Sequence, residues 1–212
     1  MNPPAIAIDG PAASGKSTVA KLIAKELGFT FINTGAMYRA VTWYVLQQGI
    51  APADTEAVKA ILPGIPLSFG KDGAVSTVMC EGRVLSEELT LQSTNDNVST
   101  IAAIPEVRAL LVEKQREYNL AEPVVMEGRD IGTVVFPNTP YKYFVTASEE
   151  VRAARRAAQG LTDSIAERDR KDSARACAPL TMADDAKLVD TSDMSIEQVV
   201  AYIAEDIRNR MA

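Results

Sequence analysis

Residues 10–18 read GPAASGKST and lie between the apolar run AIAID and the segment VAKLIAKEL. They match the pattern G-x-x-x-x-G-K-[ST] at every fixed position, which Gly10, Gly15, Lys16 and Ser17 occupy. The run before them predicts a short buried strand, and the apolar residues after them recur at helical spacing. This strand, loop and helix in succession predict the start of an α/β domain.

A loop of this composition is suited to binding phosphate. Glycines allow a path on which backbone N–H groups point inward, and the following helix adds the positive end of its dipole. The pattern predicts that Lys16 reaches the β- and γ-phosphates of a nucleotide and that the Ser17 hydroxyl ligates Mg²⁺. The residues predicted to bind the phosphates of ATP are Gly10, Pro11, Ala12, Ala13, Ser14, Gly15, Lys16, Ser17 and Thr18.

Strand and helix patterns alternate along most of the remaining chain. Strands are predicted at residues 29–33, 123–127, 141–147 and 186–190, and helices at 35–48, 53–62, 105–119, after Ser148 and after Ser195. Residues 65–84 differ, because three short apolar runs separated by turn dipeptides predict an antiparallel hairpin or meander. We therefore predict one α/β domain over residues 1–212, with a parallel sheet flanked by helices and a small antiparallel insertion.

The composition is that of an ordinary globular chain of 212 residues, with 47% apolar and 24% charged residues. No apolar run approaches the ~20 residues that cross a bilayer, and no secretory signal pattern precedes the first strand. The chain has two cysteines, Cys80 and Cys177, and no histidine, which argues against a zinc site and a histidine base. We expect a cytoplasmic, reduced protein that acts as a monomer away from membranes.

Charge is unevenly distributed along the chain. The net charge of −6 argues against a general nucleic-acid binder. Residues 152–175 nevertheless contain seven basic and four acidic residues. Such a segment can bind a small polyanion, and it can equally be a solvated helix face with opposite-charge pairs.

Triphosphate binding alone does not specify a reaction. A switch GTPase needs an N-K-x-D guanine motif, which the chain lacks. A motor ATPase normally offers an apolar strand that ends in Asp, whereas the nearest segment, VVMEGRD, has Glu127 at that place. The small size and the arginines favour a small kinase, because arginine binds phosphate with a rigid fork and phosphoryl transfer depends on positioning and charge neutralisation.

Three further motifs follow predicted strands or lie in the basic segment, where ligands of open α/β sheets can reach them. They read NTGAMYRA at residues 33–40, EGRDIGTVVFP at 127–137 and ERDRKDSARACAPL at 167–180. With IDGPAASGKST, this ordered set resembles the bacterial cytidylate kinases (CMP kinases) of the P-loop nucleoside monophosphate kinase family over nearly the whole chain. The resemblance implies a P-loop NTPase-type sheet, a monophosphate-binding region at about residues 35–108 that contains the insertion, and a short helical lid at about residues 152–176.

The same resemblance implies transfer of the γ-phosphate of ATP to CMP or dCMP with Mg²⁺, giving CDP or dCDP. The residues implied to act in catalysis are Lys16, Arg129, Asp130 and Arg175. The residues implied to bind the acceptor nucleotide are Thr34, Tyr38, Arg39, Ser99, Arg108, Arg129, Asp130, Arg168, Asp172 and Arg175. In the lid, Arg152, Arg155 and Arg156 are implied to close over ATP.

Within that set, the resemblance assigns different parts of the acceptor to different side chains. Ser99 and Arg108 would face the cytosine, and Asp130 would hold its exocyclic amine or a neighbouring group. Arg168 and Asp172 would contact the sugar. Phosphate would be bound by Arg39, Arg129 and Arg175.

Simpler local roles remain open for several of these side chains. Arg108 can be a solvated helix residue, Arg129 and Asp130 can bridge to each other, and Thr34 can cap the helix that follows it. Arg39 can pair with a local carboxylate, and Arg155 and Arg156 can be ordinary solvated residues. Asp9 and Asp130 are the carboxylates that we expect to contact Mg²⁺ or the acceptor.

Two other functions also remain open from the sequence. One is a kinase of the same architecture with another acceptor, such as UMP, dTMP or shikimate. The other is a regulatory module that uses ATP to order its basic lid and transfers phosphate to no small acceptor.

Overall fold

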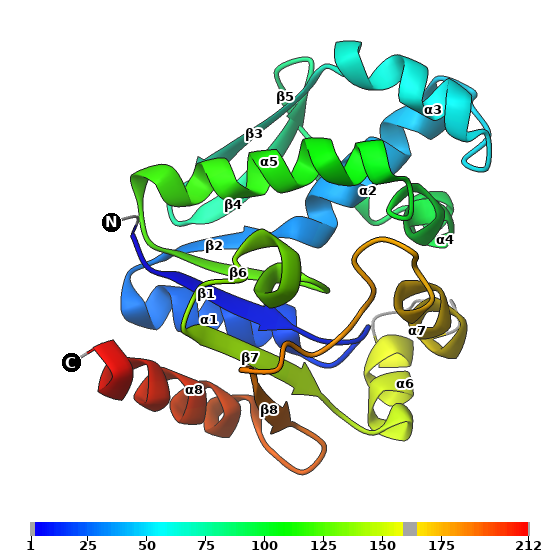
Figure 1. Ribbon diagram of the computed structural model, residues 1–212. Coiled ribbons are helices and arrows are strands. Elements are labelled where there is room, and N and C mark those ends of the chain that lie inside the picture. The colour runs from blue at the N-terminus through cyan, green and yellow to red at the C-terminus, as the bar shows by residue number, and fades with distance from the viewer. Residues whose placement is uncertain (1–2, 159–164, 212) are drawn as a thin grey trace.

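Five parallel strands form the part of the sheet that positions the site (Figure 1). The computed structural model describes residues 3–158 and 165–211. The parallel strands, in spatial order, are β2 (Thr30–Asn33), β6 (Val124–Gly128), β1 (Ala5–Asp9), β7 (Tyr141–Thr146) and β8 (Lys187–Asp190). Their carboxyl ends meet at one edge, where Asp9 stands beside Gly128 and Phe144. The predicted parallel α/β architecture is confirmed.

Helices cover both faces of these strands with apolar side chains. On one face, α1 (Lys16–Leu27) and α8 (Ile196–Met211) share a core with the sheet, in which Ile23 and Ile203 pack with Ile8. On the other face, α5 (Pro105–Ala121) and the short turn η3 (Ile131–Val135) contribute to a second core with Met126. The central strands β1 and β6 are buried on both sides, which explains their continuous apolar runs.

The predicted antiparallel insertion is confirmed as β3 (Leu67–Asp72), β4 (Val75–Cys80) and β5 (Arg83–Val84). It does not stand apart from the main sheet. β4 runs parallel to β2 with Phe31 beside Val75, and the Phe31 amide donates to the carbonyl of Ala74 over 2.8 Å. The insertion therefore extends the parallel sheet at its β2 edge.

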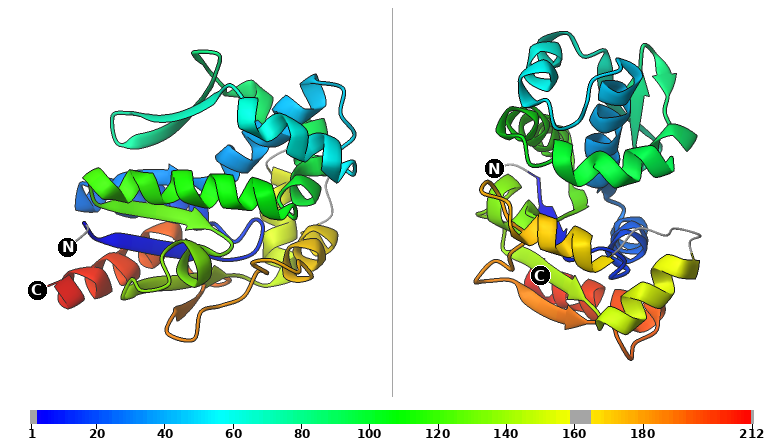
Figure 2. Two further views of the ribbon diagram at one scale, coloured as in Figure 1. Left: turned by 45° about the horizontal axis from the view of Figure 1, so that its top comes forward. Right: turned by 90° about the vertical axis from the view of Figure 1, so that its right-hand side faces the viewer.

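The remaining elements form two groups on either side of the strand ends (Figure 2). The first group has its own apolar core and comprises α2 (Thr34–Gln47), α3 (Thr55–Ile61), η1 (Leu62–Gly64), η2 (Glu87–Leu89) and α4 (Gln92–Ile101). The second group consists of α6 (Glu149–Ala158) and α7 (Ile165–Ser173), which contact each other. The strand ends thus face a space bounded by two groups of helices, which meet where α4 contacts α7.

Helix caps follow the sequence with one exception. The Ser148 hydroxyl accepts from the amide of Val151 over 3.3 Å, and Ser195 and Gln198 form the predicted reciprocal capping box over 2.8 and 3.3 Å. The interpretation of Thr34 as a cap was wrong, because α2 begins at Thr34 and the side chain of Asn33 accepts from the Ala36 amide. That leaves the Thr34 hydroxyl available for another contact.

No helix in the described ranges is both long and apolar enough to cross a membrane. Both cysteines have free thiols: Cys80, the last residue of β4, is buried, and Cys177 is exposed in the loop after α7.

Candidate active site

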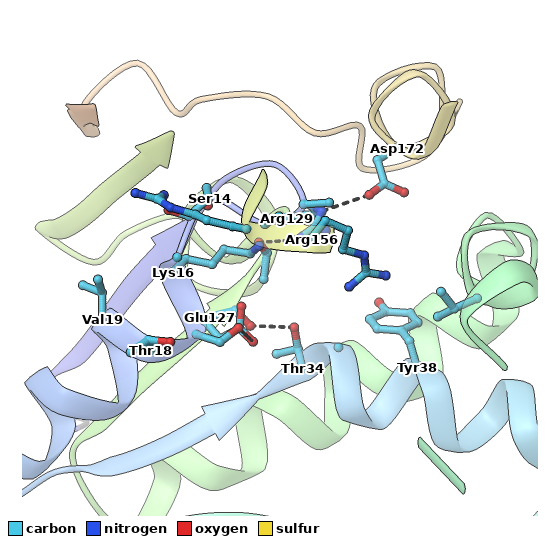
Figure 3. A pocket seen from close by; sticks show the side chains of 18 of the residues that line it. Ser14, Lys16, Thr18, Val19, Thr34, Tyr38, Glu127, Arg129, Arg156 and Asp172 are labelled. Carbon is cyan, nitrogen blue, oxygen red and sulfur yellow. Dashed lines mark hydrogen bonds and ion pairs between the residues drawn. The ribbon is translucent and has the colours of Figure 1, made fainter. Parts of the chain in front are cut away.

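A cavity of about 440 Å³ lies at the carboxyl ends of the strands and extends from the glycine loop to α4 and α5 (Figure 3). Its walls carry seven cationic and three acidic side chains. The cationic residues are Lys16, Arg39, Arg108, Arg129, Arg155, Arg156 and Arg175, and the acidic ones are Glu127, Asp130 and Asp172. This excess of positive charge, in a chain of net charge −6, suits a polyanionic ligand.

The backbone of the glycine loop adopts the positive φ angles that favour glycine. Gly10, Ala13 and Gly15 all have positive φ, at 152°, 56° and 89°. A Cβ on Gly10 would lie 2.0 Å from the carbonyl oxygen of Val145, so no other residue fits there. The loop curls around the buried Lys16, whose Nζ donates to the carbonyl of Pro11 over 2.9 Å. The ammonium is thus held at the mouth of the loop, against the cavity.

Glu127 joins the glycine loop to the end of β6. Its Oε1 accepts from the hydroxyl of Ser17 over 2.8 Å, and its backbone carbonyl accepts from the Thr34 hydroxyl over 2.7 Å (Figure 3). A hydroxyl and a carboxylate are hard oxygen ligands of the kind that Mg²⁺ takes together with substrate phosphates and waters. Ser17 and Glu127 therefore fit a magnesium ion, and within the described ranges no group of three or more acidic, histidine or cysteine side chains offers a cage of its own.

The carboxylate of Asp9 is turned toward backbone amides rather than toward Ser17 and Glu127. Both of its carboxylate oxygens accept from backbone amides, those of Ile131 and Gly132, over 2.8 and 2.7 Å. Asp9 is also absent from the lining of the cavity, whereas Glu127 is part of it. The Asp9 carboxylate, which we expected to contact Mg²⁺ or the acceptor, is thus engaged by η3, and it is Glu127, the carboxylate at the end of β6, that lies beside Ser17.

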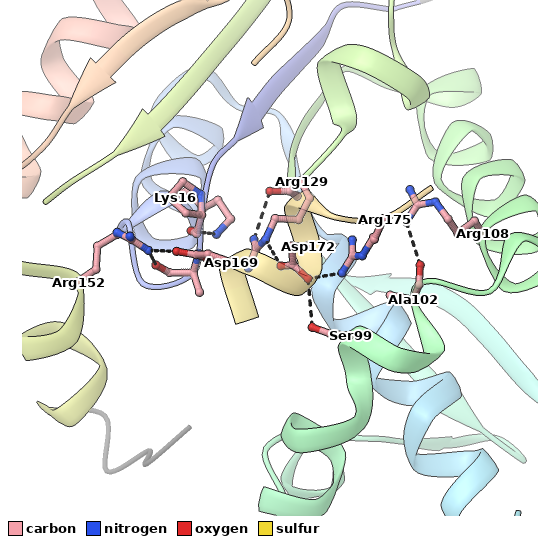
Figure 4. A network of polar contacts seen from close by, with 12 residues as sticks. Lys16, Ser99, Ala102, Arg108, Arg129, Arg152, Asp169, Asp172 and Arg175 are labelled. Atoms are coloured by element: carbon pink, nitrogen blue, oxygen red, sulfur yellow. Dashed lines mark hydrogen bonds and ion pairs between the residues drawn. The ribbon is translucent and has the colours of Figure 1, made fainter. Parts of the chain in front are cut away.

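Asp172 gathers three predicted site residues from separate elements (Figure 4). Its carboxylate accepts from Nε of Arg129 over 2.9 Å and from the Ser99 hydroxyl over 3.1 Å, and it forms an ion pair with Arg175. The partners come from α4, from the loop after β6 and from the loop directly after α7. Burial of the Asp172 side chain, which is 2% exposed, strengthens these contacts because the surroundings exclude water.

Arg108 and Asp130 form a buried ion pair at the other side of the cavity. Arg108 also donates to the carbonyl of Ala102 over 3.3 Å and lies over the ring of Tyr38, 5.5 Å from its centroid. Burial raises the pKa of Asp130 although the neighbouring charge of Arg108 opposes the shift. Arg108 is therefore not a solvated helix residue, and Arg129 and Asp130 do not bridge to each other, since each pairs with a different partner.

This buried pair leads to a prediction for stability. Asp130→Ala is expected to lower the free energy of unfolding by about 3 kcal/mol, because it leaves the guanidinium of Arg108 buried without its counter-charge. The double variant Arg108→Met with Asp130→Ala should lose less than the single variant, since no unpaired charge remains. Denaturant unfolding of both variants measures the difference.

If the double variant lost as much stability as Asp130→Ala and Arg108→Met lose separately when summed, that result would contradict the pairing. The matched control is Arg208→Ala, which removes an exposed ion pair with Glu26 and is expected to cost less than about 1 kcal/mol.

The lid arginines make different contacts from one another. Arg155 lines the cavity and donates to the carbonyl of Ser14 over 3.2 Å and to the Thr191 hydroxyl over 3.0 Å, so it is not simply solvated. Arg152 does not line the cavity. It donates to the carbonyl of Ala12 over 3.2 Å and pairs with Asp169, which accepts from the Ala12 amide (Figure 4). Arg152 thus fastens α6 and α7 to the glycine loop.

Most of the predicted residues meet in this one cavity. Those that line it are Ala12, Ala13, Ser14, Gly15, Lys16, Ser17, Thr18, Thr34, Tyr38, Arg39, Ser99, Arg108, Arg129, Asp130, Arg155, Arg156, Asp172 and Arg175. Gly10, Pro11 and Arg152 lie behind the lining, and the side chain of Arg168 lies outside the described residues.

The sequence did not point to the apolar end of the cavity. Beyond the glycine loop, this end of the cavity is lined by the apolar side chains of Val19, Met194, Ile196 and Val199 and by Thr191. Helical periodicity assigns Val19, Ile196 and Val199 to the core, and that pattern gives no sign that the same face also borders a cavity.

Comparison with solved structures places the fold among known α/β proteins. The crystal structure of TT1252 from Thermus thermophilus matches with a TM-score of 0.50 and 19% identity, covering 100% of both chains. An uncharacterized protein from Eubacterium ventriosum ATCC 27560 matches with a TM-score of 0.52 and 12% identity, covering 98% of this chain and 99% of that one. At these identities the likeness concerns the fold alone.

Sequence comparison is more specific. The cytidylate kinase of Lactiplantibacillus plantarum is 45% identical over 218 residues, 98% of this chain and 96% of the relative. The cytidylate kinase of Clostridium botulinum strain Langeland is 45% identical over 214 residues, 96% of this chain and 97% of the relative. The family model described as "Cytidylate kinase" matches residues 6–209. The chain whose glycine loop and arginines line this cavity therefore belongs to the cytidylate kinase family.

Proposed function

We propose that this protein transfers the γ-phosphate of ATP to CMP or dCMP, giving ADP and CDP or dCDP. The observation that carries the proposal is a cationic cavity that has the glycine loop at one end and Arg129, Arg175 and the Arg108–Asp130 pair at the other. A donor and an acceptor phosphate bound at these two ends would meet between Lys16 and Arg129. Membership of the cytidylate kinase family supports the same reaction.

ATP would occupy the end formed by the glycine loop, with its phosphates on the loop amides and Lys16. The apolar lining at Met194 and Ile196, beyond the loop, is suited to the adenine ring. Ser17 and Glu127 would hold Mg²⁺, which neutralises charge on the phosphates when it is bound. Arg155 and Arg156 lie along the same end of the cavity and would add positive charge over the triphosphate.

The acceptor would occupy the opposite end, with Arg39, Arg129 and Arg175 on its phosphate, Arg168 and Asp172 on its sugar, and Ser99, Arg108 and Asp130 on its base. The donors of Arg108 suit the carbonyl oxygen and ring nitrogen of cytosine, and the carboxylate of Asp130 suits its exocyclic amine. Thr34 and Tyr38 would border the nucleotide. No general base is required, because the attacking phosphate oxygen is already ionised near neutral pH and alignment with charge neutralisation lowers the barrier.

The two groups of helices beside the strand ends would have separate roles. Residues 35–108 would form the monophosphate-binding region, and residues 152–176 the lid over ATP. We propose a cytoplasmic monomer, and the free thiols of both cysteines support a reducing environment.

The direct test is ADP release by the purified protein with Mg·ATP and one acceptor at a time. We expect turnover with CMP and dCMP, and much less with UMP, AMP, dTMP or shikimate, because Asp130 offers an acceptor to an amine and would face a carbonyl in uracil. Turnover with another acceptor only would overturn the base assignments. ATP binding without turnover on any acceptor would favour a regulatory module instead.

A further inference from the structure

Asp9 is a buried carboxylate whose two oxygens are both engaged by the start of η3. Its Oδ1 accepts from the Ile131 amide over 2.8 Å and its Oδ2 from the Gly132 amide over 2.7 Å. Its exposure is 6%, so no water competes for these contacts from bulk solvent. These amides are the first two of η3, which have no partner within that turn.

Asp130 occupies the position at which an aspartate usually caps its own helix. Its carboxylate makes no such cap and pairs with Arg108 instead. Asp9, which lies on β1, accepts from the two free amides of η3. The Asp130 side chain is therefore not required as an acceptor for them. The Asp130 carboxylate is thereby available to pair with Arg108.

Asp9 also connects the two ends of the cavity through the chain. It precedes Gly10, the first residue of the glycine loop, and it binds the residues that directly follow Arg129 and Asp130. The packing around its contact with Gly132 is tight. A Cβ on Gly132 would lie 3.3 Å from Oδ2 of Asp9 and 3.2 Å from Cδ of Lys142, so the segment has little room to shift.

We propose that Asp9 is a positioning residue that caps η3 from β1, directs Asp130 to the acceptor base and fixes Arg129 relative to the glycine loop. The inference rests on the proposed transfer to CMP. It predicts that loss of the cap impairs the acceptor end of the cavity more than the ATP end, since the glycine loop keeps its own backbone path.

The first test is Asp9→Asn, in which the amide NH₂ opposes one of the two backbone N–H groups. The KM for CMP is expected to rise at least about tenfold, and the preference for CMP over UMP to fall, while the affinity for ATP changes little. Calorimetric titration with CMP alone provides a readout independent of turnover.

A second variant perturbs the same contact without changing Asp9, so the inference can still be tested if Asp9→Asn fails to fold. Gly132→Ala keeps the carboxylate but pushes the Gly132 amide away from it, and it should raise the KM for CMP in the same direction. The matched control is Thr139→Val, which removes a hydrogen bond to the carbonyl of Ala5 at the opposite end of β1. It should lower stability without changing the preference between CMP and UMP.

The pH profile adds a third readout. Burial raises the pKa of Asp9 to about 7, and the negative charge of Asp130 adds to this increase. The two backbone hydrogen bonds and the charge of Lys16 act in the opposite direction and lower the pKa. Lys142 also packs against this turn, at Gly132. As the pH falls through about 7, the carboxyl gains a proton and one oxygen accepts less well from its amide. The KM for CMP should then rise more steeply in the wild type than in Asp9→Asn, where this group does not titrate.

The outcomes separate this inference from the proposed function. Wild-type protein that fails to phosphorylate CMP overturns the function. Wild-type turnover with an unchanged CMP affinity and CMP-to-UMP preference in Asp9→Asn and Gly132→Ala overturns the role of Asp9. Equal losses in ATP and CMP affinity also overturn it, because they indicate general disruption.

Discussion

Arg129→Ala is expected to lower kcat with CMP by about 10³-fold, because the guanidinium lines the cavity and would neutralise charge on the transferred phosphoryl group. The side chain is already held in place for this role, since its Nε donates to the buried Asp172 over 2.9 Å and its Nη1 donates to the carbonyl of Gly128 over 3.4 Å. ATP affinity should change little, because the partners to which Arg129 donates among the described residues, Asp172 and Gly128, lie outside the glycine loop. A coupled assay of ADP formation and calorimetric titration with an ATP analogue measure the two quantities.

Two further variants make the test of Arg129 specific. Arg129→Lys keeps the charge but loses the planar fork, and it should recover only part of the rate. Arg208→Ala removes an arginine with an exposed ion pair on α8 and should leave kcat near the wild-type value. Turnover retained in Arg129→Ala would count heavily against phosphoryl transfer at this place.

Lys16→Met is expected to lower kcat by at least about 10²-fold and to weaken ATP binding as well, because the ammonium is buried within the glycine loop and would contact the β- and γ-phosphates. Methionine retains the length and apolar stem of lysine, so the loss reports the charge. CMP binding, measured alone by calorimetry, should persist, which is the reverse of the pattern for Arg129→Ala.

The control for Lys16 lies on the same helix. Lys21 is exposed on α1, and Lys21→Met should leave both ATP affinity and kcat unchanged. An Lys16→Met variant that binds ATP and turns over normally would show that the loop does not bind the triphosphate as proposed.

The order and type of the main elements could be predicted from the sequence because they depend on local patterns. The apolar run before Gly10 and the capping box at Ser195 involve residues only a few positions apart, and both occur as predicted. The antiparallel insertion was also predictable, since turn dipeptides between short strands are local signals. Its parallel pairing with β2, through Phe31 and Val75, was not, because those residues are far apart in the chain.

The site also has one part that local sequence predicts and another that depends on the tertiary structure. The glycine loop is defined by nine consecutive residues, so the sequence by itself determined a phosphate-binding loop at residues 10–18, together with the set of motifs that identifies the family. Which side chains face one another was decided only by the tertiary structure. Ser99 meets Asp172 across 73 positions and Asp9 meets Ile131 across 122, and no periodicity carries information over such separations. A charge in the sequence does not reveal its partner, because pairing depends on which strand ends meet at the edge of the sheet and on the burial that this creates.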